Sequence, residues 1–94
     1  MAAWGQGIEG IVRGLAVDLA PIRVNLVKPG AVHTELFADI PAERLEKVLE
    51  KMRKETLTGT VGRPEDVAEM YLGLMKCAFA SGSMVDVDGG RLLA

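Results

Sequence analysis

Apolar residues recur at helical spacing over the first stretch of the chain, from Ala2 to Leu19. They fall on one helical face and are Trp4, Ile8, Ile11, Val12, Leu15 and Leu19. A second stripe, roughly 130° away at about 100° per residue, holds only the small residues Ala3, Gly7, Gly10 and Gly14. Each mid-helix glycine costs about 0.5–1 kcal/mol relative to alanine. The stripe therefore indicates either close approach of another backbone or a weak helix held by tertiary packing.

Two short runs have the pattern of strands. Apolar residues alternate through Ile22–Val27 and include its last position, which predicts a strand buried on both faces and stopped by Pro29-Gly30. Met84–Val87 predicts a second strand, which ends at the turn Asp88-Gly89-Gly90.

An amphipathic helix is expected after Asp39, with Pro41 suited to its first turn. Its narrow apolar stripe consists of Leu45, Val48, Leu49 and Met52, and its charged face carries the i,i+4 pairs Glu43–Lys47 and Glu50–Lys54. A helix so charged on one side lies at the surface. A loop follows at 58–62.

A further helix is predicted from Pro64 to about Cys77. Its acidic first turn and basic end complement the helix dipole, and Arg63 and Asp66 are expected to fix its start. Its core face is formed by Val67, Met70, Tyr71, Leu74 and Met75. We expect Tyr71 to serve packing rather than chemistry.

The order helix, strand, helix, helix, strand predicts a single α/β domain over residues 1–94. A strand–crossover–strand unit gives a parallel pair with a right-handed connection. Two strands alone do not make a stable sheet. The first strand therefore needs a further neighbour, and an unpaired apolar strand edge is a site of association.

Composition narrows the function classes. The 94 residues include 11 basic and 13 acidic side chains, so the formal net charge is 11 − 13 = −2. The chain lacks the excess of basic residues expected of a protein that binds nucleic acid or an anionic membrane. Apolar runs fall short of the ~20 residues of a spanning helix, and the start of the chain lacks the basic region of a secretory signal. The single cysteine, Cys77, is interpreted as a buried thiol in the cytosol. We expect no metal site.

Four segments share the motifs of one family. The first is Gly7-Ile8-Glu9-Gly10 followed by Ala16–Ala20; the others are Arg23–Thr34, Gly62–Ala68 and Ser81–Gly90. In this order and spacing the chain resembles the C-terminal portion of the short-chain dehydrogenase/reductase family. The resemblance implies a truncated Rossmann-like α/β fold, with two parallel strands and about three helices, completed by oligomerisation.

The family's catalytic Tyr-x-x-x-Lys falls, by spacing, on Met1 and Gly5, whose side chains cannot perform that proton transfer. The glycine-rich pyrophosphate turn and the catalytic serine have no counterpart in the sequence. We therefore expect no redox activity and no bound cofactor for this chain alone. What the resemblance leaves of the nicotinamide site is Pro29, Gly30, Val32 and Thr34, where the Val32 backbone and Thr34 contact carboxamide and phosphates.

His33 is the leading catalytic candidate, because its imidazole changes charge near physiological pH, with Glu35 as its carboxylate partner. Asp39 is expected to be a loop residue or helix cap. The alternative for His33 is a plain loop residue.

The resemblance also places a substrate-covering segment after this loop. A remnant pocket for a small apolar molecule is expected at Trp4, Leu36, Phe37 and Met52. Trp4 equally suits a core or interface anchor, and the other three suit an ordinary amphipathic segment.

Three functions fit these residues. The first is a homo-oligomer, most simply a two-fold dimer, that binds a small apolar molecule and catalyses a cofactor-independent isomerisation, dehydration or cyclisation. The second is the C-terminal half of a split NAD(P)-dependent oxidoreductase that needs a partner chain. The third is a non-enzymatic remnant or interaction module.

Overall fold

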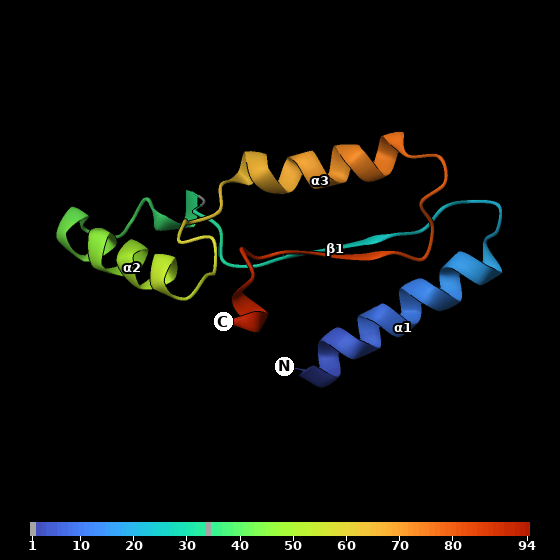
Figure 1. The fold of residues 1–94 in the computed structure, drawn as a ribbon, viewed down its shortest axis with the longest axis horizontal. Coiled ribbons are helices and arrows are strands. Elements are labelled where there is room, and N and C mark those ends of the chain that lie inside the picture. The colour runs from blue at the N-terminus through green and yellow to red at the C-terminus, as the bar shows by residue number, and fades with distance from the viewer. Residues whose placement is uncertain (1, 34) are drawn as a thin grey trace.

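The computed structural model describes residues 2–33 and 35–94, with side chains placed from residue 7 onward except Leu36. The elements are α1 (Ala2–Asp18), β1 (Leu26–Pro29), the short 3-10 helix η1 (Glu35–Phe37), α2 (Ala42–Lys54), α3 (Pro64–Lys76), β2 (Met84–Val87) and the 3-10 helix η2 (Arg91–Leu93). In the view of Figure 1, α3 lies above the two strands, α1 below them, and α2 stands apart at one end. The predicted order of elements is confirmed.

The two strands form a parallel pair in which Leu26 lies opposite Met84 and Pro29 opposite Val87. This confirms the truncated α/β fold. The first strand, however, begins later and ends later than predicted from Ile22–Val27, because Ile22 lies in an exposed turn. Pro29 is the last paired residue rather than the stop.

Pro29 is tolerated because alternate residues of β1 bond to β2. The N–H of Leu26 donates to Ser83 O at 2.9 Å and that of Gly30 to Val87 O at 2.9 Å. In a parallel ladder the intervening residues direct their backbone groups to the other edge. The missing N–H of Pro29 therefore costs no bond to β2.

The core is small. Among the described side chains only Val12 and Val27, each 8% exposed, are buried apolar residues. Several predictions of burial were wrong within this chain: Ile22 is 63%, Tyr71 46% and Met75 67% exposed, and Cys77 is exposed. Two strands offer α3 too narrow a surface to cover its whole apolar face.

Apolar side chains consequently face solvent on both outer helices. On and after α1 they are Ile11, Val17, Leu19 and Ile22, and on and after α3 they are Leu72, Met75 and Phe79. The small-residue stripe is also open, because a Cβ added at Gly7, Gly10 or Gly14 would meet nothing within 4 Å. The close approach that the stripe suggested is not made by any described part of this chain.

Arg23 joins the start of β1 to the end of α3. Its guanidinium donates to Leu74 O at 2.8 Å, Met75 O at 3.0 Å and Ala80 O at 3.1 Å. The last carbonyls of a helix lack partners within the helix, and Arg23 supplies hydrogen bonds to them. Its positive charge also interacts favourably with the negative end of the helix dipole.

Asn25 completes this junction. Its Nδ2 donates to Ala80 O at 3.0 Å, and its Oδ1 accepts from Ser83 N at 3.1 Å. The connection from α3 into β2 is therefore held in register by one amide side chain.

The start of α3 is fixed as predicted. The Arg63 N–H donates to Asp66 Oδ2 at 2.9 Å, and the Arg63 side chain reaches Asp66 Oδ1 at 3.3 Å. The start of α2 has no such cap, since Pro41 precedes it without a side-chain bond and Asp39 is an exposed turn residue.

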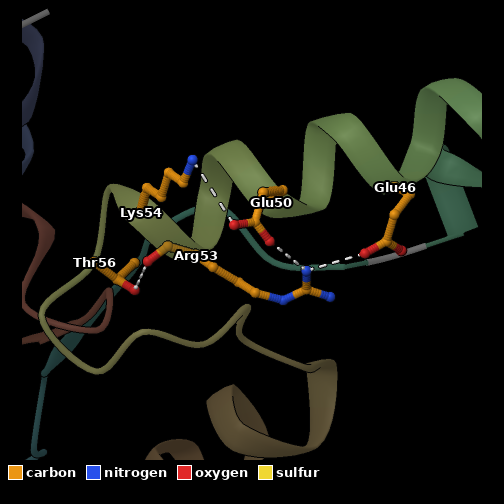
Figure 2. Close-up of polar contacts among 5 residues, drawn as sticks. All are labelled: Glu46, Glu50, Arg53, Lys54 and Thr56. Carbon is orange, nitrogen blue, oxygen red and sulfur yellow. Dashed lines mark hydrogen bonds and ion pairs between the residues drawn. The ribbon is translucent and has the colours of Figure 1, made fainter.

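The charged face of α2 carries the ion pairs drawn in Figure 2. Arg53 contacts Glu46 at 3.2 Å and Glu50 at 3.1 Å, and the predicted Glu50–Lys54 pair is present at 3.9 Å. These are the pairs of a solvated helix face and contribute little each.

None of the described helices is long and apolar enough to span a bilayer.

Candidate functional site at the carboxyl ends of the strands

In open α/β sheets, ligands bind beyond the carboxyl ends of the strands, and here the chain forms a cleft at that edge. Its volume is about 260 Å³. It lies between the ends of both strands, the loop after β1, the segment after α2 and the first turn of α3. The lining residues are Ala31, Val32, Thr56, Thr58, Thr60, Gly62, Asp66, Val67, Val87, Asp88 and Gly89.

Gly30 allows the two strand ends to approach at the floor of this region. A Cβ at Gly30 would lie 2.7 Å from Asp88 Cβ and 2.9 Å from Asp88 Cα. Real Cβ contacts are never this short, so only glycine fits without movement of the backbone.

Val32 fits a carboxamide ligand. It forms an isolated parallel bridge with Gly62, closed by the His33 N–H donating to Gly62 O at 2.8 Å. In such a bridge the flanking residues make the bonds, and Val32 directs its own N–H and C=O to the other side. Among the described residues, no backbone hydrogen bond uses those two groups. A donor and an acceptor side by side match the amide of a nicotinamide.

His33 is exposed, with its ring stacked obliquely on Phe37, centroid to centroid 5.3 Å and 36° between planes. Glu35 and Asp39 are also exposed, and no hydrogen bond or ion pair of the described residues joins either to the imidazole. The structure thus brings together His33 and Phe37, one catalytic and one pocket candidate, without a carboxylate partner.

Met52 lies at a crevice beside the cleft. The crevice holds about 10 Å³ and shares Ala31, Thr56, Thr60 and Asp88 with the cleft. Thr34 and the side chains of Trp4 and Leu36 lie outside the described residues. Of the four predicted pocket residues, Met52 and Phe37 can thus be placed, one beside the cleft and one beside His33.

The three threonines of the cleft were missed by sequence reasoning, which treated 58–62 as a plain loop. Thr56 Oγ1 lies 3.1 Å from both Arg53 O and Thr60 O, either of which can accept its one proton, and the Thr58 and Thr60 hydroxyls lie 3.0 Å apart. The alternation Thr56-x-Thr58-x-Thr60 in the sequence is the signal that could have found them.

Two groups of charges flank this edge. Arg63 holds the pKa of Asp66, which lines the cleft, below its ordinary range through side-chain and backbone hydrogen bonds. One layer below the loop, Lys28 of β1 pairs with Glu9 of α1 and lies 3.4 Å from Asp86 of β2.

This ion pair lowers the pKa of Glu9 and raises that of Lys28, chiefly by the hydrogen bond between them. The three charges connect α1 to both strands.

A second, larger groove of about 500 Å³ runs along α2 and is lined only by Glu46, Lys47, Glu50, Lys51 and Lys54. These belong to the solvated charged face of one helix. We place the site in the cleft, because there separate segments of the chain bring together hydroxyl, carboxylate and backbone groups.

A parallel strand pair with a glycine-dependent loop at its carboxyl edge is the architecture of one edge of a dinucleotide-binding sheet. The family described as the SDR-like Rossmann domain matches residues 1–94. The chain therefore belongs to the short-chain dehydrogenase/reductase family.

Individual relatives support this assignment. The short-chain dehydrogenase/reductase malC of Malbranchea aurantiaca is 49% identical over 87 residues, which cover 93% of this chain and 33% of that protein. The corresponding protein ATR9 of Stachybotrys chlorohalonatus is 48% identical over 86 residues, 92% of this chain and 34% of that protein. The chain spans about a third of the length of the curated relatives it matches.

Solved structures have the same fold. The MalC reductase/Diels–Alderase of Malbranchea aurantiaca superposes with a TM-score of 0.86 at 48% identity, over 95% of this chain and 34% of that one. A small-chain dehydrogenase in complex with NADPH gives a TM-score of 0.86 at 35% identity, over 99% of this chain and 42% of that one.

Proposed function

We propose that this chain forms the carboxyl-edge part of a short-chain dehydrogenase/reductase unit. It supplies the loop that receives the nicotinamide end of a dinucleotide and the helix that covers a small apolar substrate. The preceding strands of the Rossmann sheet, in the same protein or in another chain, supply the pyrophosphate site.

The observation that carries this proposal is the open sheet. β1 pairs with β2 alone among the described residues, and only Val12 and Val27 are buried. A two-stranded sheet is marginal in water, and an apolar strand with a free edge invites another strand. Further strands packed beside β1 would cover the exposed residues of α1 and complete the site at the same edge.

Each residue then has a limited task. The Val32 N–H and C=O bind and orient the carboxamide, and Gly30 brings the loop close to Asp88. When bound, a nicotinamide exchanges a hydride with the substrate. Met1 and Gly5 cannot supply the family's proton donor, which leaves His33, exposed on the loop after β1, as this chain's candidate for the proton donor.

The proposal is tested with a chimera in which this chain replaces the matching C-terminal third of MalC. We expect the chimera to fold and to bind NADPH or NADH, followed by nucleotide fluorescence, whereas the 94-residue chain alone binds neither. Intact MalC is the positive control.

A folded chimera that ignores both nucleotides would contradict the proposal, as would tight nucleotide binding by the chain alone. A chimera with Val32→Pro is the matched variant, because proline removes the N–H assigned to the carboxamide. It should weaken nucleotide binding.

A second candidate is a cofactor-independent cyclisation, the finer form of the activity expected from the sequence. It is favoured by the likeness to a protein described as a reductase/Diels–Alderase. A Diels–Alder addition forms two carbon–carbon bonds without net oxidation or reduction, so an enclosed pocket that orients the two reacting groups suffices. Turnover of the MalC substrate by the chimera without nucleotide would support it, and strict dependence on nucleotide would exclude it.

We also propose that copies of the chain associate. The exposed apolar residues of α1 and α3 lie on two separate helices, and the resemblance implies interfaces at both. Association would also bring the backbone of another copy of the chain into contact with the open glycine stripe of α1.

A further inference from the structure

Residues 33–61 form an excursion from the body of the chain. The excursion contains η1 and α2, leaves after Val32 and returns at Gly62, and these two residues are bridged to each other. In Figure 1 it projects beyond the ends of the strands, on the far side from the α3–β2 connection.

The helix of this excursion has little support of its own. No residue of α2 is buried, and among the described residues it packs extensively on no other helix or strand. Its own ion pairs are all within the helix. Its position must therefore be set where the excursion touches the body.

Apart from the bridge at its base, that contact is the turn after β2. The N–H groups of Leu57 and Thr58 both donate to Gly89 O, at 2.8 and 3.1 Å. Two residues further, Arg91 pairs with Glu55, the C-cap residue of α2, at 3.3 Å.

Both glycines of the turn are fitted to this contact. Gly89 has φ +67°, and a Cβ there would lie 2.8 Å from Thr58 Oγ1 and 3.1 Å from Thr56 Cβ. Gly90 has φ +80°, and a Cβ there would lie 3.0 Å from Leu57 Cδ1. The positive φ values favour glycine, and a Cβ at either position would force the side chains of the excursion to shift.

The same atoms border the cleft. Thr56, Thr58 and Gly89 line it, while Glu55, Arg91 and Met52 line the adjoining crevice. A displacement of the excursion at this contact therefore changes the width of the cleft.

We propose that the turn Asp88–Arg91 is the anchor that positions α2 beside the candidate site, with Gly89 and Arg91 as positioning residues. The anchor sets how far α2 stands from the strand ends, and so the size of ligand that the cleft admits. The assignment of α2 as a substrate cover rests on the proposed function; the anchoring itself does not.

The test measures the distance from α2 to the body with spin labels on the full 94-residue chain. One label occupies Cys77, the single cysteine, exposed at the end of α3. The other occupies Lys47→Cys on the exposed face of α2. We expect Gly89→Ala to broaden and shift the distance distribution and Arg91→Ala to broaden it less, since an exposed ion pair is weak.

Gly59→Ala is the matched control. Gly59 has φ +69°, almost that of Gly89, but a Cβ there meets nothing within 4 Å. It carries the same backbone strain without the steric contact.

Amide exchange of β2 shows whether the sheet is intact in each variant. If Gly89→Ala disrupts the sheet, the anchoring proposal is judged on the distance distribution of Arg91→Ala alone. An unchanged distribution in both anchor variants, or equal broadening in the control, overturns the anchor. Because distances are measured without nucleotide, failure of the proposed cofactor site leaves the readout intact.

Discussion

Gly30 shows how one residue without a side chain allows two strand ends to approach closely. An added Cβ would overlap the Asp88 backbone, which cannot move aside as a flexible side chain would. We expect Gly30→Ala to lower the free energy of unfolding by about 1–3 kcal/mol, the usual cost of overpacking. Chemical denaturation of the folded assembly measures this.

The control for Gly30 is Gly7→Ala, in the open stripe of α1. Alanine there adds no contact within the chain and should raise helix stability by about 0.5–1 kcal/mol. Equal effects of the two substitutions would mean that the strand ends are not held as closely as described.

Arg23 is the second residue on which several elements depend. Its three bonds satisfy carbonyls at the end of α3 and in the following loop. We expect Arg23→Ala to cost about 1–3 kcal/mol, because the carbonyls lose a charged donor. Arg23→Lys should recover only part of this, since an ammonium lacks the planar fork. The two are compared by denaturant unfolding, and an unaffected Arg23→Ala variant would contradict the role.

At the scale of elements, α1 is docked on the strands through Glu9, Lys28 and Asp86. The pKa of Glu9 is lowered on folding, so its contribution is present above its usual value of about 4.5 and is lost as the pH falls through the lower folded value. The pKa of Lys28 is raised above its usual 10.5, so its contribution is present below that value and is lost in stronger alkali.

We therefore expect the protection of the α1 amides, taken relative to their intrinsic exchange rate at each pH, to fall on acidification through the range below about pH 4.5. Glu9→Gln should remove this dependence while leaving α3 unchanged. If the acid response of α1 survives the substitution, another group controls its docking.

The elements could be predicted from the sequence to a large extent, because helices show their period over many residues. The bounds of α2, α3 and β2 follow from Pro41, Pro64 and the turn glycines. The limits of β1 were misjudged, because an apolar run does not show which of its residues pair with another strand. The segment before β1 instead bonds to the connection that leads into β2, through Gly82 N–H to Val24 O and Leu26 N–H to Ser83 O.

The candidate site was predicted less well. Of the predicted residues, Val32 lines the cleft and Met52 lines the adjoining crevice, but the threonines and the Gly89 contact depend on segments about 30 residues apart meeting in space. The pattern of residues along the sequence does not show which distant segments are in contact. Burial of Tyr71 and Cys77 was overestimated because helical periodicity shows which face is apolar, not whether anything covers it.

At the scale of the whole molecule, the exposed apolar residues predict association. We expect size-exclusion chromatography with light scattering to show a homo-oligomer, most simply a dimer. Ile11→Ser on α1 and Met75→Ser on α3 remove one exposed apolar side chain each, 62% and 67% exposed. The substitution that shifts the species toward monomer identifies the helix that associates, and a monomeric parent chain would contradict the prediction.

The bridge between Val32 and Gly62 has a consequence for how such proteins diversify. A segment that departs and rejoins at bonded neighbours is a cassette, whose length and composition can change while the strand ends stay in place. Doubling a loop costs only about 0.6 kcal/mol in closure entropy. Exchange of residues 33–61 between relatives should thus transplant substrate preference, provided that the recipient keeps the small residues on which the cassette rests.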